Sequence, residues 1–254
     1  MLCSLKDIKG YHLQAVDGEI GRCQDFLFDD RHWTIRYMVA NTHKWLPGGR
    51  RILVSPISLQ SPAREQKLLP VAVTREDIEK GPPLAEHEPV SAQYERDFFQ
   101  FYGYGYYWMG DGIWGSYTNP SYLVNPPTVP PAKEGLSDPG PKNENNAERH
   151  LRSTNEVEGY DISATDDSIG HAEDFIVDDE NWSIVYLVID TRNWLPGGRK
   201  VLIKTGQIQS VNWSSRSLKV SLSTEQIRQQ PECDLENLNK SSASQPDFIG
   251  HSFD

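Results

Sequence analysis

The stretch that decides the fold is Trp45-Leu46-Pro47-Gly48-Gly49-Arg50, because the same six letters return at residues 194–199. Pro sets φ and Gly permits positive φ, so each stretch predicts a tight turn between two strands. The turn-forming residues are Trp45, Pro47, Gly48 and Gly49 in the first stretch and Trp194, Pro196, Gly197 and Gly198 in the second. The spacing between the two stretches is 149 residues, which indicates an internal duplication.

The duplication extends well beyond this turn. Aligned at the offset of 149, residues 10–82 match residues 159–231 without a gap, and about 28 of the 73 positions are identical. Apolar residues alternate through Ile35, Tyr37 and Val39 and through their counterparts, which is the period of a strand. The sequence pattern of each copy predicts about six short strands followed by a short helix that begins at Thr74 or Ser223. Tight turns without βαβ spacing favour a small closed barrel.

The chain therefore divides into five parts. We predict an all-β protein with two barrels, an aromatic segment between them that packs as an extended flap, a proline-rich linker and a polar tail. Their bounds are 1–82 for the first repeat, 83–117 for the aromatic segment, 118–150 for the linker, 151–231 for the second repeat and 232–254 for the tail.

Two groups of residues are candidates for protein contact. The aromatic segment is rich in Tyr, Phe and Trp, which are common in interface hot spots, although our first interpretation of the segment is a scaffold that buries these rings. The second repeat has Val185, Leu187 and Ile189 where the first has Arg36, Met38 and Ala40, which predicts a buried outer face and pairing of the two barrels. The aromatic candidates are Phe98, Phe99, Phe101, Tyr102, Tyr104, Tyr106, Tyr107, Trp108 and Trp114.

The chain resembles the PRC-barrel family. The resemblance rests on Gly10, residues 17–21, Asp29 and the Trp-Leu-x-Gly-Gly turn, and on their counterparts in the second copy. The family includes the cytoplasmic domain of the photosynthetic reaction-centre H subunit and the C-terminal domain of a ribosome-maturation factor. The resemblance implies tandem bacterial barrels that bind other proteins. A reaction-centre-like assembly role rests on the family alone, since this chain lacks the H subunit's membrane helix.

The net charge, the cysteines and the length of the apolar runs limit the classes of function that we expect. The net charge is −11, from 36 acidic and 25 basic residues, which argues against nucleic-acid binding. The three cysteines form no Cys-x-x-Cys pair, and no apolar run is long enough for a membrane span, so we expect a cytoplasmic protein. The partner is not identified, and self-association of the chain stays open.

The sequence gives only weak signals of a catalytic, cofactor or ligand site. No histidine of one copy is matched in the other and no triad or phosphate loop appears, so we expect neither an enzyme nor a cofactor. Asp pairs suit turns but also a hard cation, and basic pairs after glycine turns suit an anion. Cys23 aligns with Ala172 and is interpreted as a small strand residue. The alternatives to an adaptor are a ribosome- or RNA-associated factor and a barrel that binds a small ligand or cation. The Asp residues are Asp25, Asp29, Asp30, Asp174, Asp178 and Asp179, and the basic pairs are Arg50-Arg51 and Arg199-Lys200.

Overall fold

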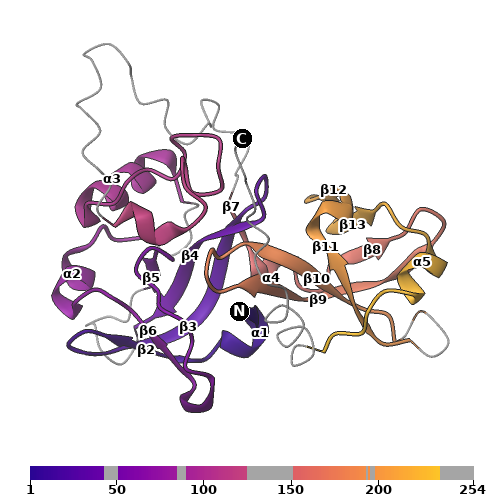
Figure 1. Cartoon of the computed structure of the whole chain (residues 1–254), viewed down its shortest axis with the longest axis horizontal. Helices are drawn as coiled ribbons and strands as arrows, with labels where there is room; N and C mark the ends of the chain where they lie inside the picture. The colour runs from indigo at the N-terminus through magenta and orange to yellow at the C-terminus, as the bar shows by residue number, and fades with distance from the viewer. Residues whose placement is uncertain (43–50, 85–89, 125–150, 193, 195–197, 235–254) are drawn as a thin grey trace, which may run out of the picture.

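The protein is described by a computed structural model that covers residues 1–42, 51–84, 90–124, 151–192, 194 and 198–234. It is mostly strands in two sheets, with few and short helices, as expected for an all-β chain. The two sheets lie side by side and meet at their long central strands (Figure 1).

The first sheet has the order β5-β4-β3-β2-β6, with β7 paired to β3. The strands β2, β3, β4 and β5 are antiparallel neighbours, whereas β6 runs parallel to β2. The bounds are β2 His12–Ala15, β3 Gly18–Asp29, β4 Thr34–Asn41, β5 Arg51–Val54, β6 Leu68–Pro70 and β7 Leu151–Ser153.

The second sheet repeats this pattern, with the order β11-β10-β9-β8-β13-β12 and β1 paired to β9. Most of its strands occupy the positions expected from the offset of 149. The bounds are β1 Leu2–Ser4, β8 Asp161–Ser163, β9 Ser168–Asp178, β10 Ile184–Asp190, β11 Lys200–Lys204, β12 Ile208–Asn212 and β13 Ser217–Val220.

Neither sheet closes into a barrel in the described part of the chain, which corrects that expectation. Each strand order has two ends, β5 and β6 in the first sheet and β11 and β12 in the second. In the first repeat the chain turns after β5, where Ser58 N donates to Ser55 O, and then bridges only to the region of β6. The segment that connects β5 to β6 thus lies beside β6, and among the described residues β5 and β6 do not pair with each other.

Short helices close each repeat, as predicted. The helices α2 (Arg75–Lys80) and α5 (Thr224–Arg228) both begin with a capping box, in which Thr74 or Ser223 bonds the backbone of the residue three positions later. The remaining helices are α1 Leu5–Ile8, α3 Ala92–Tyr102 and α4 Thr154–Val157, with 3-10 turns η1 Arg64–Gln66, η2 Pro120–Leu123 and η3 Thr205–Gln207.

The repeats exchange their first elements. The N-terminal arm (Leu2–Ile8, β1 and α1) lies on β9 of the second sheet, and the second arm (Leu151–Val157, β7 and α4) lies on β3 of the first. The hairpins also meet directly, since Ile35 N donates to Trp182 O and Ile184 N donates to Trp33 O. One hydrophobic core therefore runs through both repeats, with Phe28 and Phe175 in contact at a ring distance of 5.7 Å.

The strand β10 has buried apolar side chains on both faces, as expected for the second repeat. Leu187 and Ile189 lie in the shared core, and Val185 is half-buried. A second, smaller apolar cluster consists of Ile176, Val188 and Leu202, against which Leu2 and Cys233 pack. Register shifts on both sides of Tyr186–Val188 interrupt the strict alternation on which the prediction relied.

Candidate functional site: the aromatic segment on the first sheet

The aromatic segment begins with a helix and not with the extended flap that was expected. Ser91 caps α3 by accepting a bond from Tyr94 N, and Gly103 ends the helix in the left-handed conformation at φ 68°. This helix covers the first sheet (Figure 1). Its inward residues Phe98 and Phe99 are buried and contact Tyr37 of β4 edge-on.

A buried carboxylate joins the helix to the sheet. Glu95 is fully buried, and its Oε1 accepts bonds from Tyr37 OH at 3.1 Å and Tyr107 OH at 2.8 Å. Burial and the neighbouring Glu95 carboxylate raise the pKa of both phenols well above the usual value. The two phenols therefore remain protonated donors and hold α3 against β4.

A buried guanidinium provides the second anchor. Arg36 is 1% exposed, donates to Asp29 Oδ2 at 3.0 Å and donates to the backbone oxygen of Ile113. Its Cζ lies 4.0 Å from the ring centre of Tyr107 and 4.8 Å from that of Trp114, which are cation–π distances. Burial alone raises the pKa of Asp29, but the charge of Arg36 and the bond from His32 outweigh it and hold that pKa below its usual value.

The segment also reaches the second repeat. Trp114 is fully buried, and its Nε1 donates to Asn181 O at 2.7 Å in the β9–β10 hairpin. The aromatic segment is thus fastened to the first sheet by Glu95 and Arg36 and to the second repeat by Trp114.

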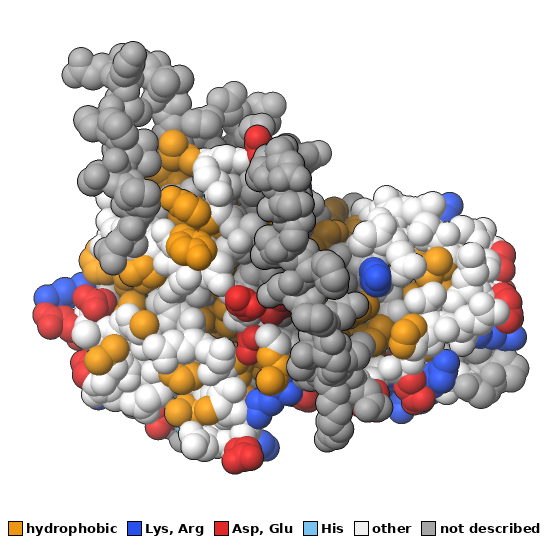
Figure 2. All heavy atoms as spheres, viewed as in Figure 1, with side chains coloured by type: hydrophobic (Ala, Val, Ile, Leu, Met, Phe, Trp, Pro, Cys, Tyr) orange, Lys and Arg blue, Asp and Glu red, His pale blue; other side chains and the backbone are white. Residues whose placement is uncertain are grey.

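The predicted contact residues divide by exposure. Buried rings cannot contact a partner unless the segment moves, and they serve as the scaffold of the segment. Phe101 is 43% exposed, and three residues that were not predicted are exposed as well: Met109 at 47%, Tyr122 at 61% and Val124 at 42%. Figure 2 shows orange side chains on the half of the molecule that carries this segment. The buried rings are Phe98, Phe99, Tyr107 and Trp114, and the half-buried ones are Tyr102, Tyr104, Tyr106 and Trp108.

The turn motifs fall largely outside the described residues. Trp45, Pro47, Gly48, Gly49 and Arg50, and Pro196 and Gly197 in the second copy, are among the residues not described. Trp194 is 46% exposed. A Cβ on Gly198 would lie 2.2 Å from Thr191 O, so the chain approaches too closely there for any other residue. The strands on either side, β10 and β11, pair antiparallel as the motif predicts.

The Asp candidates all have protein donors. Asp25 and Asp174 hold the two arms, as described below, and Asp29 pairs with Arg36. The ammonium group of Met1 contacts both Asp178 and Asp179. Asp30 accepts from Arg152 Nε at 3.1 Å. These contacts give each carboxylate a structural role.

The basic pairs and cysteines also have neighbours. Arg199 donates to the backbone oxygens of Arg228 and Gln230, and Lys200 pairs with Glu173. Cys23 is buried, and burial raises the pKa of its thiol, as expected for a small strand residue without nucleophilic character.

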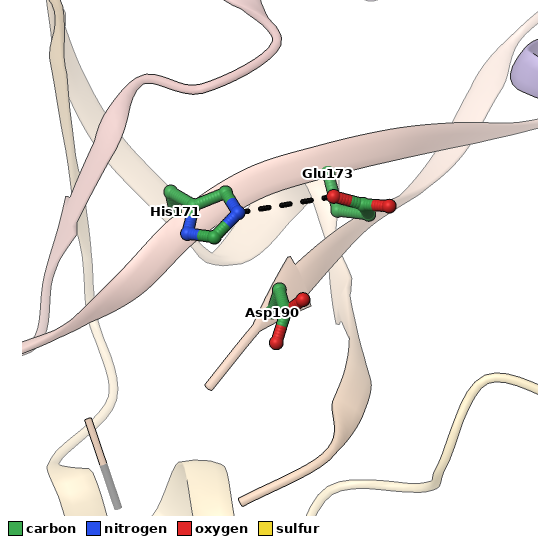
Figure 3. A group of neighbouring side chains, drawn as sticks. All are labelled: His171, Glu173 and Asp190. Atoms are coloured by element: carbon green, nitrogen blue, oxygen red, sulfur yellow. Dashed lines mark ion pairs between the residues drawn. The ribbon is translucent and has the colours of Figure 1, made fainter. Parts of the chain in front are cut away.

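One cluster with metal-ligand chemistry appears that the sequence did not indicate. His171, Glu173 and Asp190 each offer an atom within 4.8 Å of the others, from the neighbouring strands β9 and β10 (Figure 3). The copies give no signal for it, because the first repeat has Arg22, Gln24 and Asn41 at these positions.

Cations of the protein already occupy this cluster. Glu173 Oε1 accepts from Lys6 Nζ at 2.7 Å and from Lys200 Nζ at 2.8 Å, and Arg192 donates to both oxygens of Asp190. Burial raises the pKa of Glu173, but its bonds with Lys200 and Lys6 outweigh this effect and lower it. The bond from Arg192 lowers the pKa of Asp190 to about 2. We interpret the group as an ion-pair network, in which a metal ion would have to displace three basic side chains.

Sequence reasoning also missed the two groups that build the site. Arg36 is an isolated basic residue in an apolar strand, which was a usable signal because such a residue is rarely buried without a partner. Glu95 gave no signal, since one acidic residue on a helix is ordinarily solvated.

No helix of the described residues has the length and apolar character that a membrane span requires. No protein-family model and no curated protein matches the chain.

Proposed function

We propose that this chain is a non-catalytic protein–protein interaction module, an adaptor, whose contact surface is the exposed part of the aromatic segment with the adjoining turn η2. The observation that carries the proposal is the division of the segment into a buried, fastened side and an exposed apolar side. Phe101, Met109 and Tyr122 are large apolar side chains that face solvent on a rigid support.

The physical reason for this choice is the low entropy cost of such a surface. A ring on a fastened segment loses little freedom when a partner covers it, and aromatic residues dominate interface hot spots. The Glu95 and Arg36 anchors keep the segment in place without occupying its outer side. We further propose that the two sheets are tandem PRC-type domains, a proposal supported by the repeat motifs and the matching strand orders.

Site-specific cross-linking tests the surface. A photo-reactive amino acid replaces Phe101 in one variant and Tyr122 in another, and Gln209, exposed on the second sheet, serves as the control position. In cells that make the protein naturally, we expect both variants to capture one common protein that the Gln209 variant does not capture. Capture of no common protein, or equal capture from Gln209, contradicts the proposal.

Substitution then separates contact from stability. Phe101→Ser with Tyr122→Ser should weaken binding of the captured protein at least tenfold while the free energy of unfolding changes little. Val16→Ser is the matched control, because Val16 is 72% exposed but lies on a turn of the first sheet. If Val16→Ser weakened binding as much as the double substitution does, the contact would lie elsewhere.

A further inference from the structure

The two arms make the same backbone contacts on different sheets. Leu2, Cys3 and Ser4 pair antiparallel with Asp178, Val177 and Ile176. Leu151, Arg152 and Ser153 pair in the same register with Asp29, Phe28 and Leu27, each position shifted by 149. The receiving edges of β9 and β3 are therefore equivalent binding sites for one kind of segment, a strand followed by one helical turn.

A buried carboxylate recognises the serine of each arm. Asp174 accepts from Ser4 Oγ at 2.5 Å and from Lys6 N at 3.0 Å. Asp25 accepts from Ser153 Oγ at 2.5 Å and from Asn155 N at 3.1 Å. Because Asp25 and Asp174 are 5% and 8% exposed, an arm without this serine leaves a buried carboxylate short of a donor.

Apolar residues anchor the helical turn of each arm in the shared core. Leu5 and Ile8 of the first arm are buried at 0% and 2%, and Val157 of the second arm is fully buried. An arm thus inserts one or two aliphatic side chains while its serine fixes the register.

The two sites differ at several positions, and one of these differences changes the charge of both the arm and the strand that receives it. On β9, Glu173 pairs with Lys6 of the N-terminal arm at 2.7 Å. On β3 the equivalent residue is Gln24, and the arm carries Asn155 in place of the lysine, with Asn155 Nδ2 donating to Gln24 O. The second arm has an ion pair of its own, Arg152 with Asp30 at 3.1 Å, so the contact that favours the first arm on β9 is the pair of Lys6 with Glu173.

We infer that the β9 edge, with Asp174 and Glu173, is a binding site that also accepts the N-terminal arm of a second copy of this chain. Two chains that exchange their N-terminal arms in this way would form a closed twofold dimer in which each arm keeps its contacts with β9. Gly10, at φ +88° and with no atom within 4 Å of its Cβ position, follows the arm directly and is the hinge that this exchange requires. The inference does not depend on the proposed function, because it concerns a different surface.

A labelled peptide of residues 1–10 probes the site. It is added to the chain lacking residues 1–9, and binding is followed by fluorescence anisotropy. We expect saturable binding that Ser4→Ala in the peptide weakens about tenfold. Lys6→Asn should weaken it about two- to fivefold, because this ion pair is half-exposed, and Glu173→Gln should abolish the effect of Lys6→Asn. A peptide of residues 150–159 should bind less tightly than the first peptide.

A second experiment does not require the shortened chain to fold. A protease site is inserted after Gly10 of the full chain, the folded protein is cut, and the labelled peptide is added in excess. Incorporation of the label supports the site. Failure of the label to enter, or equal entry of the Ser4→Ala peptide, overturns it.

The role of a second copy is tested on the intact chain. The dimer fraction, obtained from the mass measured by light scattering, should grow with protein concentration. The arm of a second copy competes for β9 with the chain's own arm, which has an effective concentration of about 1 mM. The chain lacking residues 1–9 has no arm to exchange and should form no such dimer, whereas the exposed control Asp161→Ala should keep the dimer fraction. A chain that is monomeric at every concentration contradicts the exchange between copies.

Discussion

Arg36 is a charged side chain inside the protein, and its removal should cost more than a surface substitution. Arg36→Val inserts the residue of the second repeat but leaves Asp29 buried without its cation. We expect a loss of about 3–5 kcal/mol in the free energy of unfolding. Adding Asp29→Asn should recover part of it, measured as a double-mutant cycle in denaturant. Full additivity of the two losses would show that the pair is not coupled.

Asp190 should stabilise the folded protein by an amount that decreases as the pH becomes acid. Its pKa of about 2 lies below the usual value of 3.8 for an aspartate, so its ionised form stabilises the folded state above about pH 4. This contribution is lost as the pH falls from about 4 to about 2. The variant Asp190→Asn should be less stable at pH 7 and should lose less stability over that range, measured by thermal unfolding. Asp161→Asn, which removes a carboxyl at an exposed position, should keep the normal acid profile.

At the scale of the element, Gly170 permits β9 to approach its neighbouring strand β10 closely. Its φ is +148°, and a Cβ there would lie 2.1 Å from Asp190 O. Gly170→Ala should therefore destabilise the protein by more than about 2 kcal/mol, measured by chemical unfolding. Gly206→Ala is the matched control, because nothing lies within 4 Å of its Cβ position, and it should change stability by less than about 0.5 kcal/mol. Equal effects would show that β9 can move away from β10.

At the scale of the whole molecule, the exchanged arms should hold the two repeats together without a covalent link. A protease site placed within the linker, between Pro130 and Pro131, allows the folded chain to be cut. We expect the two fragments to elute together in size-exclusion chromatography and to unfold in one transition, because each carries the arm that the other needs. The uncut protein with the same insertion is the control. Separation of the fragments in native buffer would contradict this account.

The local structure could be predicted from the sequence because it depends on neighbours along the chain. The offset of 149 predicted the pairing of equivalent strands, and Thr74 and Ser223 marked the starts of α2 and α5. The candidate site could be predicted only in part. The ring composition located the aromatic segment, but α3 was missed although Tyr94, Phe98 and Tyr102 recur every four residues, because the glycines that follow favoured an extended interpretation of the whole segment.

By itself, the sequence determined that the protein is a duplication of one strand-rich unit with an aromatic segment between the copies. Only the tertiary structure decided which sheet receives each arm, that Arg36 and Glu95 are buried, and that Leu187 and Ile189 face the shared core. The reason is physical. Leu2 and Leu151, with Ser4 and Ser153, repeat at the same offset, but an arm of either copy satisfies the same backbone and serine bonds on its own sheet or on the other. That choice depends on contacts such as Lys6 with Glu173, which join residues 167 positions apart.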